Sequence, residues 1–575
     1  MELWFLSNPA LLKRERDAFD QLKKEAEWLI GLEWSLPGKL SVLAVIRVHG
    51  HDYKVRMEYP TYFPDSQPAV YPVEADRRWS THQYGERGSL CLEWGPDNWL
   101  PEVTGADLIR SAYKLLSIEN PMGNAKAETM PQAPTRHQLT MGQELRNKFL
   151  RCMITRNLKE FLQNITLKAP VPIRFSSSFH PNSWVVMFHQ VEVPGQEVWK
   201  DSRVSCDRHI YRGIFIKATD YTGSLKDLAR IEDFAKAGLS EEMLALHLAQ
   251  AKEEKQDDLA ILMQGGNGEF RFYLLMNDRK VYAFEPILEG DGINRMPAGY
   301  QGLAGKKVCI VGLGSLGSKI AITLARSGTE SFYLVDHDLF LPDNVKRHAL
   351  TWDQVGEHKV DGVQDMISKI DKNIKVETKC INLTGQESAA HLDVCLSKMS
   401  ECDLIIDCTA NERVFNLLCS VANRDQKKFL WAAVFEGGRG GQMGRFIPNV
   451  SAPPQVIRAA YNEFCLKNPS PIVKVAEDYI REDMEGRVIA ASDADVSVIA
   501  DNAARFAIDC LLEVNEYEFP MYLIGMGKWW VFRSPLEVIP IACGSVSQEK
   551  IEQGSELDED GKNFLNDLIK KSGQA

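Results

Sequence analysis

The stretch Lys306–Gly317, KKVCIVGLGSLG, constrains the fold of this chain more than any other part of the sequence. Its apolar residues 308–311 have the character of a buried parallel strand. Glycines in the spacing G-x-G-x-x-G follow, and residues 318–326 have a helical pattern. Such glycines permit a tight turn, close backbone approach and helix–strand packing, and the helix amino terminus favours phosphate. The stretch therefore predicts a Rossmann-like nucleotide-binding strand–turn–helix. Its glycines are Gly312, Gly314 and Gly317.

The residues after this motif indicate which nucleotide is bound. A second apolar strand ends in Asp336, 24 residues beyond Gly312, where an acid binds ribose hydroxyls. The residues that follow within a short passage are Asp338, Asn344, Arg347 and Lys359. A dehydrogenase needs the ribose acid alone, whereas a triphosphate also needs cations that neutralise developing charge. A later strand ends in Asp407, a natural Mg²⁺ ligand near bound phosphates. We therefore expect ATP and Mg²⁺.

This part of the sequence, roughly residues 295–545, resembles the ThiF/MoeB and ubiquitin-activating adenylation family. The resemblance implies that Asp336 contacts ribose and that Asn344, Arg347 and Lys359 contact phosphates. It also implies a homodimer in which Arg295 reaches the neighbouring active site. The family's magnesium aspartate falls at Ala410 here, so Asp407 is the expected substitute. Members join a carboxyl-terminal glycine to AMP, release pyrophosphate and pass the acyl group to a thiolate.

Two late cysteines are candidates for that thiolate. Cys465 is expected in an irregular crossover, roughly where many activating enzymes keep their cysteine. Cys543 is expected in a turn of small residues just after a carboxyl-terminal strand, and we favour it. Cys510 lies inside a long apolar helical pattern and is expected to be a core residue.

The amino-terminal region predicts a small α+β domain. Residues 9–33 have helical apolar spacing, 40–48 and 53–59 predict strands, and the proline-punctuated 59–73 predicts an edge strand. A further helix is expected over 105–116. Between them Cys91 lies in a loop shortly after Gly88, where a thiol can be either reactive or a core residue.

The same region resembles the ubiquitin-conjugating catalytic domain. The resemblance rests on a Y-P-x-x-x-P passage, the eight-residue spacing from cysteine to tryptophan and a W-x-P motif. The matching residues are His82, Gly88, Cys91, Leu92, Trp99, Pro101 and 115–121. It implies that Cys91 carries a thioester, with His82 beside it. The family's His-Pro-Asn reads His82-Gln83-Tyr84 here, so Gln83 or Asn98 is the expected amide donor.

The middle of the chain carries no recognisable motif. We expect a helix over 141–163, alternating strands at 183–193, 211–219 and 270–288, and helices within 226–254. His180, His189 and His209 lack metal-ligand spacing, so this module is interpreted as a spacer that positions its neighbours.

Composition limits the remaining function classes. A chain of 575 residues needs several domains, and its net charge of −12 argues against general nucleic-acid binding. The 12 cysteines form no C-x-x-C pair, which argues against structural zinc. The sequence has no signal peptide and no apolar run near 20 residues, so we expect a cytoplasmic location without membrane contact.

The chain is therefore predicted to be a multidomain α/β and α+β protein. The expected parts are a ubiquitin-conjugating-like domain (1–125), a linker (126–145), a central α+β spacer domain (146–292), a Rossmann-like ThiF-type adenylation domain (293–547) and an acidic tail (548–575). This combination resembles the activating–conjugating fusion proteins of bacterial CBASS antiphage operons. There the resemblance implies adenylation of the carboxyl terminus of a cGAS/DncV-like nucleotidyltransferase, transfer between two cysteines and ligation to an amine. A ubiquitin-like donor, sulfur-carrier activation, a non-catalytic nucleotide-binding scaffold and a dehydrogenase remain alternatives.

Overall fold

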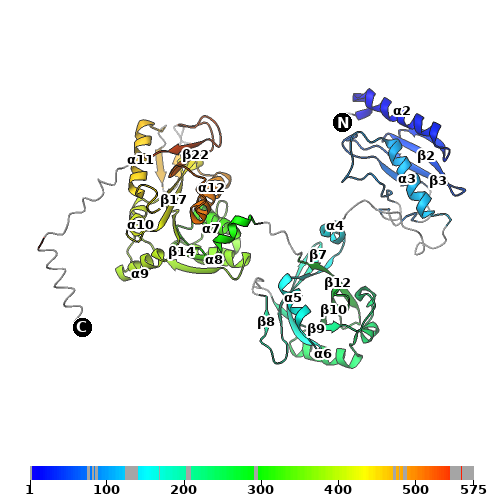
Figure 1. Ribbon diagram of the computed structural model, residues 1–575, viewed down its shortest axis with the longest axis horizontal. Helices are drawn as coiled ribbons and strands as arrows, with labels where there is room; N and C mark the ends of the chain where they lie inside the picture. Colours follow the sequence, from blue (N-terminus) through cyan, green and yellow to red (C-terminus); the bar gives the residue numbers. More distant parts are fainter. Residues whose placement is uncertain are drawn as a thin grey trace. The chain divides into compact units, whose positions relative to one another are not determined.

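The computed structural model describes residues 3–73, 78–80, 83–84, 88–123, 140–167, 169–201, 209–289, 296–470, 474–477, 480–482, 488–543 and 559. The chain is divided into two units, Met1–Asn147 and Lys148–Ala575. Figure 1 labels the helices and strands of both. Among the helices that are described, none combines the length and the apolar character needed to cross a bilayer.

The first unit is a four-stranded antiparallel meander with helices. The strands pair in chain order, and the edge strand β4 is the short one expected from the prolines. Phe19 and Leu22 of α2 and Ile109 of α3 are fully or almost fully buried in its core. The elements are α1 (Trp4–Ser7), α2 (Pro9–Glu25), β1 (Leu29–Ser35), β2 (Ser41–Val48), β3 (His51–Glu58), β4 (Ala69–Pro72) and α3 (Gly105–Glu119).

The predicted helix over 9–33 is too long. Helix α2 ends at Glu25, and residues 29–35 form β1, which pairs with β2. Leu29 and Ile30 fit a helical apolar period, but the exposed edge of β2 offers them a partner strand, and tertiary pairing overrides local propensity. The strands and the helix expected after this point are present with shifted ends.

The second unit contains a closed ring of strands in the middle of the chain. Strand β5 pairs with both β12 and β7, which closes the order β5-β12-β11-β10-β9-β6-β7 on itself. The strands are β5 (Leu150–Ile154), β6 (Val171–His180), β7 (Ser183–Val191), β8 (Trp199–Lys200), β9 (Ile210–Ala218), β10 (Leu259–Gly265), β11 (Phe270–Leu275) and β12 (Val281–Leu288). The helices are α4 (Met141–Leu145, from the end of the first unit), α5 (Arg156–Asn164) and α6 (Glu241–Glu253).

The single helix predicted over 141–163 is wrong. Strand β5 lies between α4 and α5, and Cys152 at its centre is fully buried. Helix α5 begins where the Thr155 side chain accepts a hydrogen bond from the Leu158 amide, so the helical pattern starts only there. The expectation also missed β6 and β10 as strands of the ring.

A doubly wound domain follows. Its sheet has the order β15-β14-β13-β16-β17-β18-β22-β23, with β15 to β17 parallel and β18, β22 and β23 antiparallel. The strands are β13 (Lys307–Val311), β14 (Ser331–Asp336), β15 (Lys375–Cys380), β16 (Leu404–Asp407), β17 (Lys428–Phe435), β18 (Gly440–Phe446), β22 (Met521–Gly525) and β23 (Val538–Ile541). A separate small sheet holds β19 (Lys474–Glu477), β20 (Ile480–Glu482) and β21 (Val488–Ile489).

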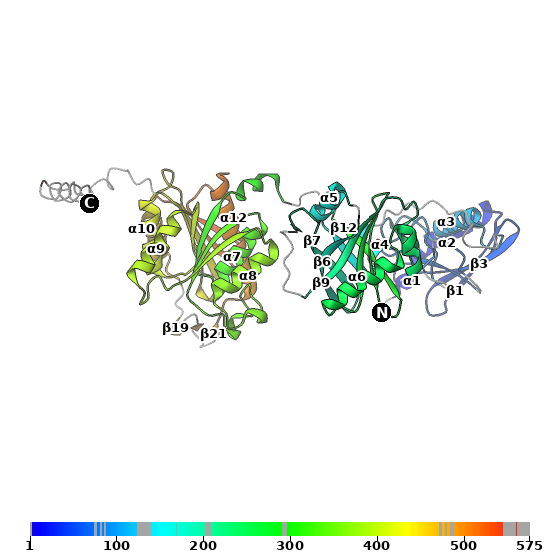
Figure 2. The same cartoon turned by 90° about the horizontal axis from the view of Figure 1, so that it is seen from below.

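Helices cover both faces of the large sheet (Figure 2). Alternate residues of β13 point to opposite sides: Val308 and Ile310 join the core with α7, α8 and α12, while Cys309 and Val311 join the core with α9, α10 and α11. This is why the strand is apolar at every position. The helices are α7 (Ser315–Arg326), α8 (Lys359–Ile370), α9 (Ala389–Ser400), α10 (Glu412–Arg424), α11 (Pro454–Lys467) and α12 (Asp493–Leu512).

Candidate functional site

The glycine-rich turn connects β13 to α7 as the sequence predicts. Gly312 has a φ of +85°, and a Cβ there would lie 2.8 Å from the Thr409 side chain. A Cβ on Gly317 would lie 1.9 Å from the Gly312 carbonyl oxygen, so no larger residue fits. Around Gly314, by contrast, a Cβ would meet nothing within 4 Å. Two glycines are thus required by packing, and the third leaves open space at the amino terminus of α7, where anions bind.

Asp336 ends β14 beside this turn and is buried. Its Oδ2 accepts a hydrogen bond of 2.5 Å from the Leu313 amide, and its Oδ1 accepts one of 2.8 Å from the Asp338 amide. The carboxylate is therefore held in place between the glycine turn and the following loop. That is the position expected for a ribose-binding acid.

The predicted cations lie along the segment that follows. The Lys359 ammonium, at the start of α8, donates a 2.6 Å hydrogen bond to Asp338. Burial acts to raise the pKa of Asp338, but the bond and charge of Lys359 and the nearby His337 outweigh it, and the net shift is downward. Asn344 accepts a hydrogen bond from the Leu341 amide. No described residue forms a hydrogen bond or ion pair with the Arg347 guanidinium, so this charge is available to an anion.

Asp407 ends β16 at the same edge of the parallel sheet and is 3% exposed. Its Oδ1 accepts hydrogen bonds from the Thr409 amide (2.9 Å) and hydroxyl (2.7 Å). Burial raises the pKa of Asp407 to about 6. No described residue donates to its Oδ2. One open carboxylate oxygen fits Mg²⁺, whose other ligands in nucleotide sites are phosphates and water.

A second acidic group lies nearby. Among the described residues, Asp336, His337 and Asp338 place one ligand atom each within 4.8 Å of one another. Both carboxylates already accept hydrogen bonds, from Leu313, the Asp338 amide and Lys359. The group is therefore better described as the anchor of the glycine turn than as a metal centre.

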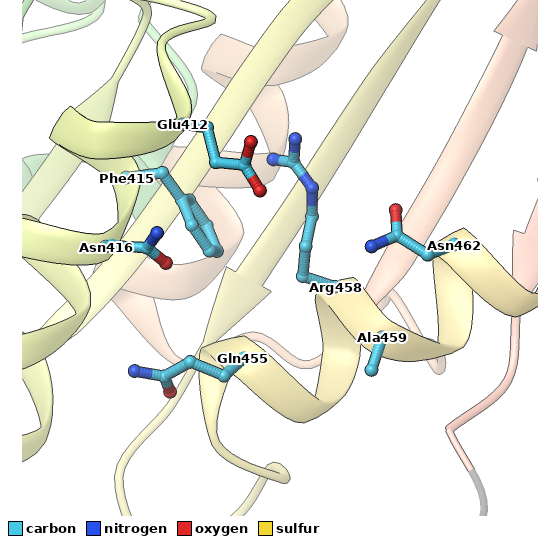
Figure 3. A pocket seen from close by; sticks show the side chains of 7 residues that line it. All are labelled: Glu412, Phe415, Asn416, Gln455, Arg458, Ala459 and Asn462. Atoms are coloured by element: carbon cyan, nitrogen blue, oxygen red, sulfur yellow. The ribbon is translucent and has the colours of Figure 1, made fainter.

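A pocket of about 110 Å³ lies between α10 and α11 (Figure 3). In Figure 3 the side chains of Glu412 and Arg458 point toward one another from the two helices. The Arg458 guanidinium also lies 5.0 Å from the centre of the Phe415 ring. Helix α10 starts directly after Asn411, which caps it, so the pocket begins next to the loop that follows Asp407. Its lining combines Glu412, Arg458 and three side-chain amides with the apolar Phe415 and Ala459.

In the first unit, Cys91 is half-buried and lies in the connection between β4 and α3. A Cβ on Gly88 would lie 1.5 Å from the Tyr84 carbonyl oxygen, so glycine is required in the turn that leads to the thiol. The Trp99 indole donates a 2.6 Å hydrogen bond to the Pro64 carbonyl, next to the cis Phe63–Pro64 peptide. This bond ties the W-x-P motif to the proline-rich passage.

Both side-chain amides expected to serve Cys91 already have partners. The Gln83 amide donates to the Gly88 carbonyl (3.2 Å) and accepts from the Trp79 amide (2.9 Å). The Asn98 amide donates to the Glu93 carbonyl (2.7 Å). They close the loops on either side of the thiol instead of pointing at it.

Sequence reasoning missed Tyr84 as a hydrogen-bond donor to the Cys91 thiol. Its hydroxyl donates to the Cys91 Sγ at 3.9 Å, and its pKa is raised by burial and by Cys91 itself. The one available signal was its place in the family's asparagine position. His82 and Arg295, two further predicted site residues, lie outside the described residues.

The late cysteines differ in setting. Cys465 lies within helix α11, so the expectation of an irregular crossover is wrong. Pro454 stands at the first position of this helix, where proline is tolerated, and residues 455–467 contain no proline or glycine. Cys543 lies two residues after the end of β23, just after a strand as expected, and is half-buried; residues 544–558 lie outside the described ones. Burial raises the pKa of both thiols. Cys510 is 1% exposed within α12, as predicted for a core residue.

Comparison with known proteins agrees with this domain. A model of the ThiF family matches residues 293–516. The chain is 32% identical over 129 residues to the ATP-dependent ubiquitin transferase-like protein Cap2 of Enterobacter hormaechei subsp. hoffmannii (strain UCI 50), covering 22% of this chain and 21% of that protein. It is 28% identical over 181 residues to ubiquitin-like modifier-activating enzyme 5 of Drosophila virilis, covering 29% of this chain and 44% of that protein. The chain thus spans less than half the length of either relative.

The E. coli MccB structure with ATP is 18% identical in sequence to this chain, and the match covers 44% of this chain and 68% of the MccB chain. Its TM-score of 0.33 is too low to add to the assignment. The assignment rests instead on the matched residues, the doubly wound sheet and the glycine turn. The carboxyl-terminal domain of this chain is therefore a ThiF-family domain, similar in sequence to a ubiquitin-like modifier-activating enzyme.

Proposed function

We propose that this chain activates the carboxyl terminus of a protein donor with ATP, carries it as a thioester and ligates it to an amine. The observation that carries the proposal is that the glycine turn and the anchored Asp336 occur together with an Arg347 guanidinium that pairs with no described residue. A hydride-transfer enzyme has no use for that guanidinium, whereas a triphosphate has.

In the first step the donor carboxylate attacks the α-phosphorus of ATP and pyrophosphate leaves. Asp336 accepts hydrogen bonds from the ribose hydroxyls. The amino terminus of α7 and Gly314 face the phosphates. Arg347, Lys359 and Asn344 neutralise and orient the leaving pyrophosphate. Asp407, through its open oxygen, would hold Mg²⁺, which supplies further charge neutralisation. The pocket beside Arg458, which offers charged, amide and apolar side chains, is the place we propose for the extended tail of the donor.

In the next steps the acyl group moves between thiols. The thiolate of Cys543, or of Cys465 as the alternative, attacks the acyl carbon and AMP leaves. The Cys91 thiolate then attacks the thioester and releases the first thiol, and a target amine finally forms the amide and releases Cys91. Because both thiols are on one chain, the exchange is intramolecular and is favoured by effective concentration. His82 stays a predicted neighbour of Cys91.

We propose that Tyr84 supplies the hydrogen bond that the family takes from an asparagine. It is the described side chain that donates to the Cys91 sulfur, while Gln83 and Asn98 have other partners. A hydroxyl beside the sulfur lies near the carbonyl oxygen of a thioester formed there, where negative charge develops during aminolysis.

The donor and the biological setting follow from similarity. The likeness to Cap2 supports a CBASS antiphage protein whose donor is the carboxyl terminus of a cGAS/DncV-like nucleotidyltransferase. The likeness to an enzyme that activates a ubiquitin-like modifier supports a small ubiquitin-like donor instead. Homodimerisation through the ThiF-family domain, with Arg295 reaching the partner's site, and a cytoplasmic location stay predictions.

A non-catalytic nucleotide-binding scaffold is the second candidate. Ala410, in place of the expected magnesium aspartate, favours it, since Asp407 alone offers the metal one open oxygen. A scaffold binds ATP without consuming it.

The test is an adduct assay with the full chain, MgATP and a donor that ends in glycine. We expect a reductant-sensitive adduct on wild-type protein. C543A should lose every adduct, and C91A should keep the first adduct but release no ligated product. Cys380, an exposed thiol of the same domain, provides the matched control C380A, which should behave as wild type.

Loss of the first adduct in C465A instead of C543A would move the activating role to Cys465. Ligated product from C91A at the wild-type rate would refute the role of Cys91. The absence of any adduct, together with unchanged ATP, would favour the scaffold.

A further inference from the structure

The imidazole of His348 joins two parts of the nucleotide site. It is 7% exposed and directly follows Arg347. Its Nε2 lies 2.7 Å from the Leu313 carbonyl oxygen, and its Nδ1 lies 3.1 Å from the Leu350 amide nitrogen. The Leu350 amide can only donate, so Nδ1 accepts and Nε2 must carry the proton that is donated to Leu313. The contacts thereby select a neutral imidazole in one tautomer.

Leu313 lies between the first two glycines of the turn. Its amide is already fixed by Asp336, and His348 fixes its carbonyl. In a planar trans peptide the C=O and the next N–H point in opposite directions. The bond from His348 therefore turns the Gly314 N–H away from the imidazole. That N–H makes no hydrogen bond to a described residue, and the space around Gly314 is open.

The other side of His348 contacts the segment that carries Arg347, whose guanidinium pairs with no residue in the described part of the chain. The Ala349 amide donates to the Ser318 hydroxyl at 3.3 Å, and the Phe340 ring lies 4.9 Å from the imidazole ring. One side chain thus connects the glycine turn to the backbone that carries Arg347. The two parts that must meet a triphosphate are linked through it.

We propose that His348 is a positioning residue for the nucleotide: it directs the Gly314 N–H into the site and holds Arg347 at a fixed place relative to it. The proposal rests on ATP being the ligand, as proposed above. The surroundings of His348 keep it neutral at physiological pH: burial lowers its pKa most, the bond to the Leu313 carbonyl opposes this, Lys359 and Lys319 add to it, and the pKa falls to about 4. A neutral imidazole can both donate and accept, as the two bonds require.

The first test measures MgATP affinity of the full chain by calorimetry at pH 7.5. H348F keeps a ring against Phe340 but loses both hydrogen bonds, and we expect its Kd for ATP to rise about tenfold. H348Q can donate and accept, and should stay within about threefold of wild type. F340L, which disturbs the same packing without touching either bond, is the matched control and should also stay within about threefold.

The second test is independent of ATP. Hydrogen exchange of residues 311–318 in the protein without nucleotide should accelerate about tenfold in H348F and little in H348Q or F340L. Should H348F fail to fold, H348N, which is too short to span both partners, takes its place.

Equal affinity and equal exchange in H348F and wild type would overturn the positioning role, as would a matching loss in F340L. If wild-type protein binds no ATP, the proposed function fails, and the exchange experiment still decides whether His348 holds the glycine turn.

Discussion

His348 and Asp407 are buried titratable groups whose pKa values move in opposite directions. The pKa of His348 falls from 6.5 to about 4, and that of Asp407 rises from 3.8 to about 6, in both cases chiefly because of burial. Both shifts favour the neutral form, since a poorly solvated charge is costly. Because the unfolded chain titrates at the ordinary values, each group links stability to pH.

The two links have opposite signs. As the pH falls from 6.5 toward 4, the unfolded chain protonates His348 and the folded chain does not, so the free energy of unfolding falls. As the pH falls from 6 toward 3.8, the folded chain protonates Asp407 before the unfolded chain does, so the free energy of unfolding rises. At pH 5 the pH is 1.5 units below 6.5, where the effect of His348 begins, and 1 unit below 6, where the effect of Asp407 begins. At about 1.36 kcal/mol per pH unit, His348 lowers the free energy of unfolding by about 2 kcal/mol and Asp407 raises it by about 1.4 kcal/mol.

These contributions nearly offset each other in the wild-type chain, so variants are needed to separate them. H348Q removes the pH-dependent contribution of His348 to stability, and D407N removes that of Asp407. The assay is thermal unfolding at pH 7.5 and pH 5, following the transition that MgATP shifts upward, which identifies the ThiF-family domain. The Tm of a domain of this size changes by about 2–4 °C for each kcal/mol of change in the free energy of unfolding. The change in Tm between pH 7.5 and pH 5 should therefore be about 4–8 °C more positive in H348Q than in wild type, and about 3–6 °C more negative in D407N.

The exposed His391 of α9 supplies the control H391Q, which should follow wild type at both pH values. If H348Q loses stability between pH 7.5 and pH 5 in parallel with wild type, His348 is not held neutral by its surroundings. The hydrogen-bond assignment used for the glycine turn would then be wrong.

Three further predictions concern the proposed reaction. R347A should raise the KM for ATP in pyrophosphate exchange about tenfold or more, because one charge-assisted contact to phosphate is lost; an unchanged KM would remove Arg347 from the site. A410D restores an acid at a position whose φ of +53° suits Asp better than Ala; it should lower the Mg²⁺ concentration needed for half-maximal exchange several-fold, and no change would argue that the 410 position is remote from the metal. Y84F should leave loading of Cys91 unchanged and slow its discharge to an amine about tenfold in single turnover; equal discharge rates would exclude the Tyr84 hydroxyl as the stabilising donor.

The glycine turn and the place of Asp336 at the end of a strand were predictable because their determinants are local. Gly312 and Gly317 are required by backbone geometry and by contacts within one turn, and Asp336 ends the neighbouring strand. Such constraints leave a fixed spacing in the sequence.

Features that depend on distant partners were not predictable. Residues 29–35 form a strand because the edge of β2 is available, and Cys465 lies in a helix although its neighbours carry no strong signal. His348 holds Leu313 across 35 positions, a relation that leaves no motif. Tyr84, for which no role was predicted, bonds to the Cys91 sulfur in place of Gln83, because the Gln83 amide closes its own turn.

Pyrophosphate exchange into ATP, measured with the full chain and a panel of peptides that end in glycine, tests the central claim most directly. The reaction proposed here predicts exchange that requires a peptide, is lost in R347A and persists in C543A and C91A, since adenylation precedes any thioester. Absence of exchange with every donor, in a chain that binds ATP, would contradict the claim and leave a nucleotide-binding scaffold.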